Sequence, residues 1–313
     1  MDNYQGVVIR STGNSCTVLS SDGLIVECRL KGNFRIKGIK STNPIAVGDK
    51  VEYTFQQEKD FGLIHAIADR HNYIIRKATR LSALSHIIAA NIDQAMVMVT
   101  LTRPRTSTGF IDRFLVTSEA YHIPAFIIFN KCDQYSGEEL AKLDALIRLY
   151  SGLGYPCFRT SALLGQGIED VRELLRGRVS LISGHSGVGK TALINTIEPG
   201  LLRKVGAISE YHLKGKHTTT FAEMLPLRDG GFVIDTPGIK EFGLVNFDKQ
   251  EVPERFPEMR NLMHLCQFNN CTHVHEPGCA VKRALSRGEI NPSRYSNYIS
   301  ILKDEYFDEA EWD

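Results

Sequence analysis

The sequence has no apolar run long enough to cross a membrane and no leader typical of secretion. A membrane-spanning helix needs about 18 or more consecutive apolar residues, and no stretch of this 313-residue chain approaches that length. The first five residues, Met1-Asp2-Asn3-Tyr4-Gln5, do not resemble a signal peptide. We therefore expect a cytoplasmic protein with no membrane partner.

Net charge is also nearly absent. Lysine and arginine number 37 and aspartate and glutamate 36, which leaves a formal net charge of +1. Overall charge therefore gives no sign of nucleic-acid binding, and any basic surface must be local. The segment from Lys31 to Lys40, with Arg35 and Lys37, is such a candidate. The hydrophobic share of 42% and the charged share of 23% are ordinary for globular proteins, and the length predicts two or three domains.

Cysteines are few, and disulfide bonds explain them poorly. There are seven, an odd number, and Cys266, Cys271 and Cys279 cluster beside histidines. In a protein without a secretory leader, such a cluster indicates metal binding rather than disulfide pairing.

A complete phosphate-binding loop lies past the middle of the chain. Residues 184 to 191 read Gly-His-Ser-Gly-Val-Gly-Lys-Thr, between an apolar strand pattern at 179–182 and a helical pattern at 192–197. The glycines allow backbone N–H groups to surround phosphate oxygens, and the helix start adds a positive dipole end. We expect Lys190 to contact the β- and γ-phosphates and the Thr191 hydroxyl to bind Mg²⁺.

A guanine-reading motif precedes that loop. Asn130-Lys131-Cys132-Asp133 follows Ala125–Phe129, a buried-strand pattern. The Asp133 carboxylate can accept hydrogen bonds from both N–H groups on guanine's edge, which adenine does not offer. Lys131 can lie along the base, and Asn130 can brace two loops. Alone, such a tetrapeptide would usually be an ordinary polar loop.

Three further segments complete a nucleotide-site pattern. Thr160-Ser161-Ala162 resembles the second guanine-contacting loop of small GTPases. Asp235-Thr236-Pro237-Gly238 follows the apolar strand Gly231–Ile234, so that Asp235 can hold Mg²⁺ through water and Gly238 can sense a γ-phosphate. Between the phosphate loop and this motif, Lys216-His217-Thr218-Thr219-Thr220 is a candidate switch, in which a threonine can complete the metal shell.

The order of these motifs is permuted. In an ordinary GTPase the phosphate loop comes first, whereas here the two guanine-reading segments precede it. Such a permutation is physically tolerable because the motif loops all lie at one edge of a parallel sheet, and joining the old termini leaves that edge intact.

In this order the motifs resemble the ribosome small-subunit-dependent GTPase A family, RsgA, over nearly the whole chain. The segments that carry the resemblance are 130–133, 184–191, 215–220 (Gly-Lys-His-Thr-Thr-Thr), 235–238 and the cluster that begins at Cys266. The resemblance implies a GTPase that works with the small ribosomal subunit and its rRNA during late subunit maturation. We expect a monomer that binds GTP and GDP.

The fold class expected is multi-domain α+β. Residues 1–70 contain five short strand patterns and the hairpin signal Asp22-Gly23, which suggest an OB-type RNA-binding barrel, as the resemblance also implies. Residues 71–245 alternate strand and helix patterns, as expected for a permuted P-loop GTPase domain. Residues 246–313 are expected to form a helical zinc-binding module, and Arg76 to His86 is interpreted as a linker. The strands expected in the barrel lie near residues 4–10, 15–19, 24–30, 50–55 and 62–68.

The carboxyl-terminal cluster reads Cys266-x4-Cys271-x-His273-x5-Cys279. Three thiolates and one imidazole suit a closed tetrahedral Zn²⁺ site. The family pattern places the histidine ligand at His273; His275 is a nearby rival and His264 a weaker one. A module of this size is poorly able to build a core alone, so zinc is expected to supply folding energy.

The expected reaction is in-line attack of water on the γ-phosphate, which depends on positioning and charge neutralisation. Ile239 follows the Asp235–Gly238 motif, so the water-orienting glutamine of Ras-like enzymes is missing and intrinsic turnover should be slow. His217 is a candidate for that role once a partner orders its loop. Two alternatives stay open: a P-loop kinase of small metabolites, and an RNA-binding scaffold with little turnover.

The expected site residues fall into four groups. The catalytic candidates are His217, Lys190 and Thr191, and the Mg²⁺ candidates are Thr191, Thr218 and Asp235. The zinc candidates are Cys266, Cys271, His273 and Cys279. The GTP-binding candidates are Asn130, Lys131, Cys132, Asp133, Ser161, Ala162, Gly184, His185, Ser186, Gly187, Val188, Gly189, Lys190, Thr191, Ala192, Asp235 and Gly238.

Overall fold

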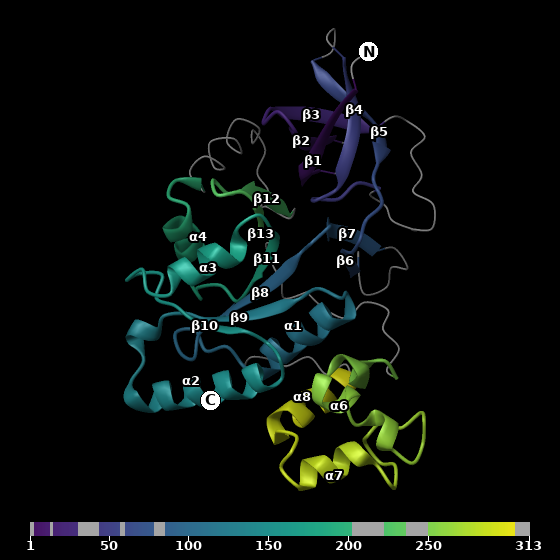
Figure 1. The fold of residues 1–313 in the computed structure, drawn as a ribbon, viewed down its shortest axis with the longest axis vertical. Coiled ribbons are helices and arrows are strands. Elements are labelled where there is room, and N and C mark those ends of the chain that lie inside the picture. The colour runs from purple at the N-terminus through teal and green to yellow at the C-terminus, as the bar shows by residue number, and fades with distance from the viewer. Residues whose placement is uncertain are drawn as a thin grey trace.

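The chain folds into three parts that follow one another along the sequence. The structure, a computed structural model, describes residues 3–12, 15–30, 44–56, 60–77, 85–201, 222–235 and 250–303. Figure 1 shows a small barrel at the top, a sheet flanked by helices in the middle, and a helical module at the bottom. Among the described residues, no helix is both long and apolar enough to span a membrane.

The first part is a closed five-stranded barrel, as predicted. Strand β1 pairs with both β2 and β4, β3 pairs with β2 and β5, and β4 pairs with β5, so that no strand edge is left open. Alternate residues point inward, and Val8, Val18 and Ile64 are fully buried in the barrel core. The strands are β1 (Asn3–Ser11), β2 (Ser15–Ser20), β3 (Ile25–Leu30), β4 (Lys50–Gln56) and β5 (Phe61–Ile67).

A two-stranded hairpin follows the barrel where the sequence predicted a linker. Strand β6 (Tyr73–Lys77) pairs antiparallel with β7 (Ser85–Ala90). The side chain of Asn72 holds the base of this hairpin, because it donates to the carbonyl of Ile92 at 2.7 Å and accepts from its N–H at 2.8 Å. The loop before β4 packs against the same region, where the Ala90 N–H donates to the carbonyl of Val47 at 2.8 Å. The described residues of this region, 71–77 and 85–92, therefore form a structured junction.

The central part is a doubly wound sheet. Its strand order is β10-β9-β8-β11-β13-β12, parallel except for β12, which runs antiparallel to β13. Strand β12 also contacts β1 of the barrel through the pair Arg10 and Glu223, so the two sheets are continuous. The strands are β8 (Gln94–Val99), β9 (Ala125–Phe129), β10 (Cys157–Arg159), β11 (Val179–Ser183), β12 (Glu223–Pro226) and β13 (Phe232–Asp235).

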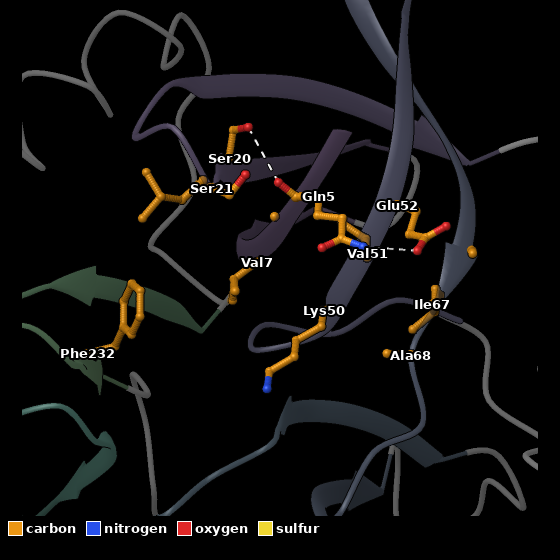
Figure 2. A pocket seen from close by; sticks show the side chains of 13 residues that line it. Gln5, Val7, Ser20, Ser21, Lys50, Val51, Glu52, Ile67, Ala68 and Phe232 are labelled. Carbon is orange, nitrogen blue, oxygen red and sulfur yellow. Dashed lines mark hydrogen bonds between the residues drawn. The ribbon is translucent and has the colours of Figure 1, made fainter. Parts of the chain in front are cut away.

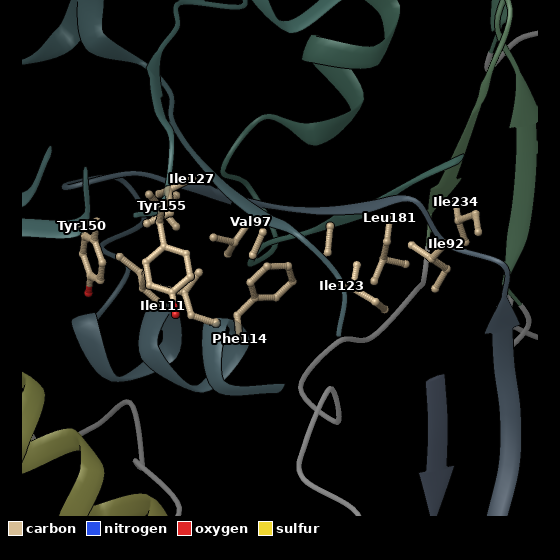
Figure 3. Packing of buried hydrophobic residues seen from close by; sticks show 14 of the residues in the cluster. Ile92, Val97, Ile111, Phe114, Ile123, Ile127, Tyr150, Tyr155, Leu181 and Ile234 are labelled. Carbon is tan, nitrogen blue, oxygen red and sulfur yellow. The ribbon is translucent and has the colours of Figure 1, made fainter. Parts of the chain in front are cut away.

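Helices cover both faces of this sheet, as the strand pleat dictates. Along β8, Val97 belongs to the core under helices α1 and α2, whereas Met96 and Met98 belong to the core under α3 and α4. Figure 3 shows the first of these cores, with Phe114 of α1 lying against the sheet beside Val97. The helices are α1 (Thr108–Ala120), α2 (Gly137–Gly152), α3 (Ile168–Leu175) and α4 (Lys190–Ile197), with the 3₁₀ turn η1 (Cys132–Gln134) before α2.

The carboxyl-terminal part is helical and packs against α1. Its core surrounds Phe256, Met259 and Tyr298 and includes Val116 of α1, so the module completes its core with a residue of the central domain. Asn291 caps the last helix through its side chain, which accepts from the Ser293 N–H at 2.9 Å. The elements are η3 (Val252–Arg255), α6 (Pro257–Arg260), η4 (Met263–Leu265), α7 (Ala280–Ser286) and α8 (Pro292–Leu302).

A pocket lies between the barrel and the sheet. It has a volume of about 570 Å³ and is lined by barrel residues, among them Val7 and Lys50, and by Phe232 of β13 (Figure 2). Phe232 begins β13, whereas the phosphate loop follows the end of β11, which runs parallel to β13. The pocket is therefore at the opposite edge of the sheet from the phosphate loop and is a separate feature.

Candidate nucleotide site and metal centre

The predicted nucleotide-binding loops converge at one edge of the central sheet. Strands β9, β10, β11 and β13 are all parallel, and each is followed directly by one of the predicted segments. From β8 the chain moves outward to β9 and β10, and then returns to the other side of β8 to form β11 and β13. The winding thus reverses between β8 and β11, and the carboxyl edge at such a reversal is where doubly wound sheets bind ligands.

The phosphate loop has a backbone that only glycine adopts easily. Gly184 has φ 149° and Gly189 has φ 106°, and a Cβ on Gly184 would collide with the carbonyl oxygen of Met98 on β8. Helix α4 begins immediately after Gly189, and no side chain within the described residues caps it. The first N–H groups of α4 are therefore directed into the loop, where an anion can accept them.

Lys190 lies inside this loop. Its Nζ donates to the carbonyl oxygens of Gly184 and of His185, the latter at 3.0 Å. These two carbonyls hold the ammonium group where the loop curls around the predicted phosphate position. Thr191, the next residue, is exposed at the helix start, so its hydroxyl is accessible to a metal ion bound to the phosphates.

Asn130 connects the phosphate loop to the guanine-reading loops. Its side chain is buried, and its Nδ2 donates to the carbonyl of Val188 in the phosphate loop at 2.9 Å. Its Oδ1 accepts from the Ala162 N–H at 3.1 Å and from the Thr160 hydroxyl at 3.0 Å. One side chain therefore fixes three loops that come from β9, β10 and β11.

In the rest of the Asn130–Asp133 segment, Lys131 and Cys132 are partly buried and Asp133 is exposed. Lys131 has a left-handed backbone, with φ 62°, and its Nζ donates to the carbonyl of Arg103 at 2.6 Å. The Tyr135 hydroxyl donates to the carbonyl of Asn130 at 2.6 Å and closes the turn. Asp133 is exposed, and within the described part of the chain its carboxylate has no hydrogen-bond partner. This carboxylate is accessible to the edge of a base.

The Ser161 loop lies next to the Asn130–Asp133 segment. Ser161 is buried and exchanges backbone hydrogen bonds with Gln166 at 3.0 and 3.1 Å, which closes a tight loop. The Cys132 N–H donates to the carbonyl of Thr160 at 3.1 Å, so this loop and the Asn130–Asp133 segment are directly joined. The Ala162 carbonyl accepts from the hydroxyl of Thr196 on α4 at 3.1 Å.

The switch segments are described only at their margin. Asp235 is the last residue of β13 and pairs in register with Ile182 at the end of β11, which places its backbone beside the phosphate loop. The predicted switch residues His217, Thr218 and Gly238 lie outside the described residues.

An aromatic contact on the phosphate loop was not predicted from the sequence. The ring of Phe110, in the first turn of α1, lies 3.9 Å from the imidazole of His185, measured between ring centroids. No local pattern signals this pair, because Phe110 has the spacing of one apolar residue in an amphipathic helix. The contact connects α1 to the phosphate loop.

The four predicted metal ligands come together in the carboxyl-terminal module. The ligand atoms of Cys266, Cys271, His273 and Cys279 all lie within 4.8 Å of one another. His273 Nδ1 is 3.6 Å from the sulfur of Cys266 and 3.4 Å from that of Cys279. Bonds of about 2.3 Å in a tetrahedron place zinc ligands about 3.8 Å apart, so this arrangement fits a zinc ion.

Burial supports the assignment of His273 rather than its two rivals. His273 is 1% exposed, whereas His264 and His275 are exposed and belong to no such cluster among the described residues. Burial lowers the pKa of the His273 imidazole, which keeps it neutral and able to coordinate. Burial also raises the pKa of the Cys271 thiol to about 12; a bound dication reverses that preference and favours the thiolate.

A carboxylate not predicted from the sequence organises the ligand loop. Glu276 accepts hydrogen bonds from the Thr272 N–H and hydroxyl at 2.8 and 2.6 Å, and from the N–H groups of Val274 and His275 at 3.0 and 3.1 Å. Burial would raise the pKa of this carboxyl, but these hydrogen bonds lower it to about 2. Glu276 thus fixes the backbone on both sides of His273.

A buried ion pair anchors the module to the central domain. Arg294 of α8 is 1% exposed, and its Nη1 lies 2.7 Å from Oδ1 of Asp112 on α1. Its Nε and Nη2 form a two-pronged contact with Glu258 at 2.7 and 3.0 Å. Burial raises the pKa of Asp112, which Arg294 opposes. The pairing of Arg294 with Asp112 was not predicted from the sequence, because the two residues are 182 positions apart.

Comparison with known proteins agrees with this architecture. A family model described as "RsgA GTPase" matches residues 67–245, and one described as "RsgA N-terminal domain" matches residues 5–64. The small ribosomal subunit biogenesis GTPase RsgA of Bacteroides fragilis is 53% identical over 300 residues, with 96% of each chain covered. The protein of the same name from Christiangramia forsetii is 51% identical over 303 residues, also with 96% of each chain covered.

Solved structures show the same fold. The crystal structure of YjeQ from Thermotoga maritima superposes with a TM-score of 0.79 at 36% identity, covering 97% of this chain and 98% of that one. The structure of YloQ, described as a circularly permuted GTPase, gives a TM-score of 0.73 at 28% identity, with 97% and 95% covered.

Proposed function

The chain belongs to the RsgA family of circularly permuted GTPases, and from that premise we propose that it hydrolyses GTP at the carboxyl edge of its central sheet in the service of small-subunit maturation. As a member of this family it is a GTP hydrolase. The observation that carries the assignment of the site is the side chain of Asn130, which joins the phosphate loop to both guanine-reading loops.

The phosphates are bound by residues 184–192, with Lys190 moving from its loop carbonyls to the β- and γ-phosphates. Two exposed groups support this assignment: Thr191 at the start of α4, for a phosphate-bound Mg²⁺, and Asp133 beside the Ser161 loop, for the base. Mg²⁺ supplies charge neutralisation at the phosphates when it is bound. Thr218 and Asp235 complete its ligands, and Gly238 senses the γ-phosphate.

The metal in the carboxyl-terminal module is zinc, and its role is structural. Three sulfurs and one imidazole at tetrahedral spacing, with the ligands largely buried, favour zinc over harder cations. The module completes its own core only with a residue of α1, so metal binding supplies part of its folding energy.

The partner is the small ribosomal subunit with its rRNA. The relatives are named for biogenesis of that subunit, and the barrel of residues 1–70 is a fold that binds single-stranded nucleic acid. The chain thus divides into an RNA-binding barrel, a GTPase domain of residues 71–245 and a zinc module of residues 246–313. It acts as a cytoplasmic monomer.

Nucleotide titration and single-turnover hydrolysis test this function. GDP should bind far more tightly than ADP, and the rate of GTP hydrolysis in the presence of small ribosomal subunits should fall in His217→Ala while GDP affinity stays near that of the parent. Equal affinity for GDP and ADP would contradict recognition of guanine by the Asn130–Asp133 segment. Equal hydrolysis by parent and variant would remove His217 from the mechanism without affecting the site itself.

A further inference from the structure

Helix α8 of the zinc module contacts two functional regions at once. On one side, the hydroxyls of Tyr295 and Tyr298 donate to the carbonyls of His273 and Thr272 in the metal-ligand loop, the first at 2.7 Å. On the other side, Arg294 and Asn297 reach α1 of the central domain. Residues only one to four positions apart therefore tie both regions to a single helix.

The contact with α1 is buried and made by several groups. Asp112 is fully buried, and its carboxylate accepts from Arg294 at 2.7 Å, from the Tyr150 hydroxyl at 2.9 Å and from Asn297 Nδ2 at 2.5 Å. The same Asn297 Nδ2 lies 3.3 Å from the hydroxyl of Thr108, the first residue of α1. A buried, fully bonded arrangement of this kind has one geometry, because every alternative leaves a charge or a donor unpaired.

The first turns of α1 contact both α8 and the phosphate loop. Phe110 lies between Thr108 and Asp112 in the sequence, and its ring lies 3.9 Å from the His185 imidazole. The carbonyl of His185 in turn accepts from Lys190 Nζ at 3.0 Å. A shift of the first turns of α1 would therefore move the residue that sets the position of the phosphate-binding lysine.

We propose that Arg294 of the zinc module is a positioning residue for nucleotide binding, which acts through Asp112 and Phe110 on His185 of the phosphate loop. The inference rests on the proposed nucleotide site and adds that the affinity of that site depends on a side chain in another module. By reciprocity of binding free energies, the bound nucleotide also favours the docked position of α8.

A double-mutant cycle on GDP binding tests this coupling. The four proteins are the parent, Arg294→Lys, Phe110→Leu and the double variant, and circular dichroism confirms that each is folded at the temperature used. Each single substitution should weaken GDP binding by roughly three- to tenfold, mainly through faster dissociation, and the double variant should be no weaker than the poorer single variant. The inference is overturned if the fold-losses of GDP affinity in the two single variants multiply in the double variant, or if Arg294→Lys binds GDP as tightly as the parent.

A matched control and a milder variant separate positioning from loss of structure. Arg260 also joins the module to α1, but it pairs with Glu119 near the far end of the helix, at 2.8 Å. Arg260→Lys should therefore leave GDP affinity unchanged, and an equal loss there would overturn the positioning role. If Arg294→Lys does not fold, Asn297→Ala takes its place in the cycle with the same expectation. If the parent does not bind GDP, the proposed function is overturned as well. If the parent binds GDP but the fold-losses of the two substitutions multiply, this inference alone is overturned.

Discussion

Replacement of Asn130 by alanine should separate the phosphate loop from the base-reading loops. The substitution removes three hydrogen bonds, to Val188, Ala162 and Thr160, within a buried environment. At about 1 kcal/mol each, these bonds contribute about 3 kcal/mol. Part of that loss appears as stability and part as nucleotide affinity, because the loops must be brought back into position on binding. We expect the Kd for GDP to rise roughly ten- to a hundredfold, which corresponds to about 1.4–2.8 kcal/mol.

The assay is titration of GDP against folded protein, alongside denaturant unfolding of the same samples. Asn72→Ala is the matched control, because it removes two side-chain hydrogen bonds to Ile92 at the opposite edge of the sheet. That variant should lose about 2 kcal/mol of stability with GDP affinity unchanged. A role for Asn130 in holding the nucleotide loops together is refuted if folded Asn130→Ala binds GDP within about twofold of the parent, or if Asn72→Ala loses as much affinity.

Three other substitutions test the site and the metal centre. Asp133→Asn should weaken GDP binding by roughly 1.5–3 kcal/mol and improve binding of xanthosine diphosphate, whereas unaltered base selectivity in a titration would exclude Asp133 from base contact. Cys271→Ala should release zinc and unfold the carboxyl-terminal module, and less than about half an equivalent of zinc in the parent, measured by metal analysis, would contradict a zinc site. Glu276→Gln should destabilise the module at pH 7, whereas Glu289→Gln on its surface should not. Because the pKa of Glu276 is lowered from 4.5 to about 2, the difference in unfolding free energy between the parent and Glu276→Gln should narrow as the pH falls from 4.5 to about 2. A difference that does not change with pH would contradict the role of the charge.

The sequence predicted those features that are encoded locally. The phosphate loop, the Asn130–Asp133 segment and the Ser161 loop each follow a recognisable buried strand, and parallel strands bring such loops to one edge regardless of the order in which the chain visits them. The metal ligands were equally local, since Cys266 and Cys279 are separated by a short loop. The barrel followed from five short strand patterns and the hairpin signal Asp22-Gly23.

Features that depend on distant partners were not predicted. In the sequence, Arg294 looks like an exposed charge on a helix, but in the fold it pairs with the buried Asp112. Glu276 likewise looks like a solvated loop carboxylate, although four donors of the ligand loop point at it. The segment from Arg76 to His86 has the sequence of a linker between two domains, and the pairing of β6 with β7 has no signal in it. Charge and polarity alone do not reveal which side chains a fold will bury.

Dependence of this GTPase on the small ribosomal subunit is tested by the rate of GTP hydrolysis with and without purified small subunits, with large subunits as the matched control. The protein alone should hydrolyse GTP slowly, and small subunits should raise its rate by at least about tenfold because docking completes the active site. Large subunits should leave the rate unchanged. A rate that small subunits do not raise, or that large subunits raise equally, would contradict a GTPase dedicated to the small subunit.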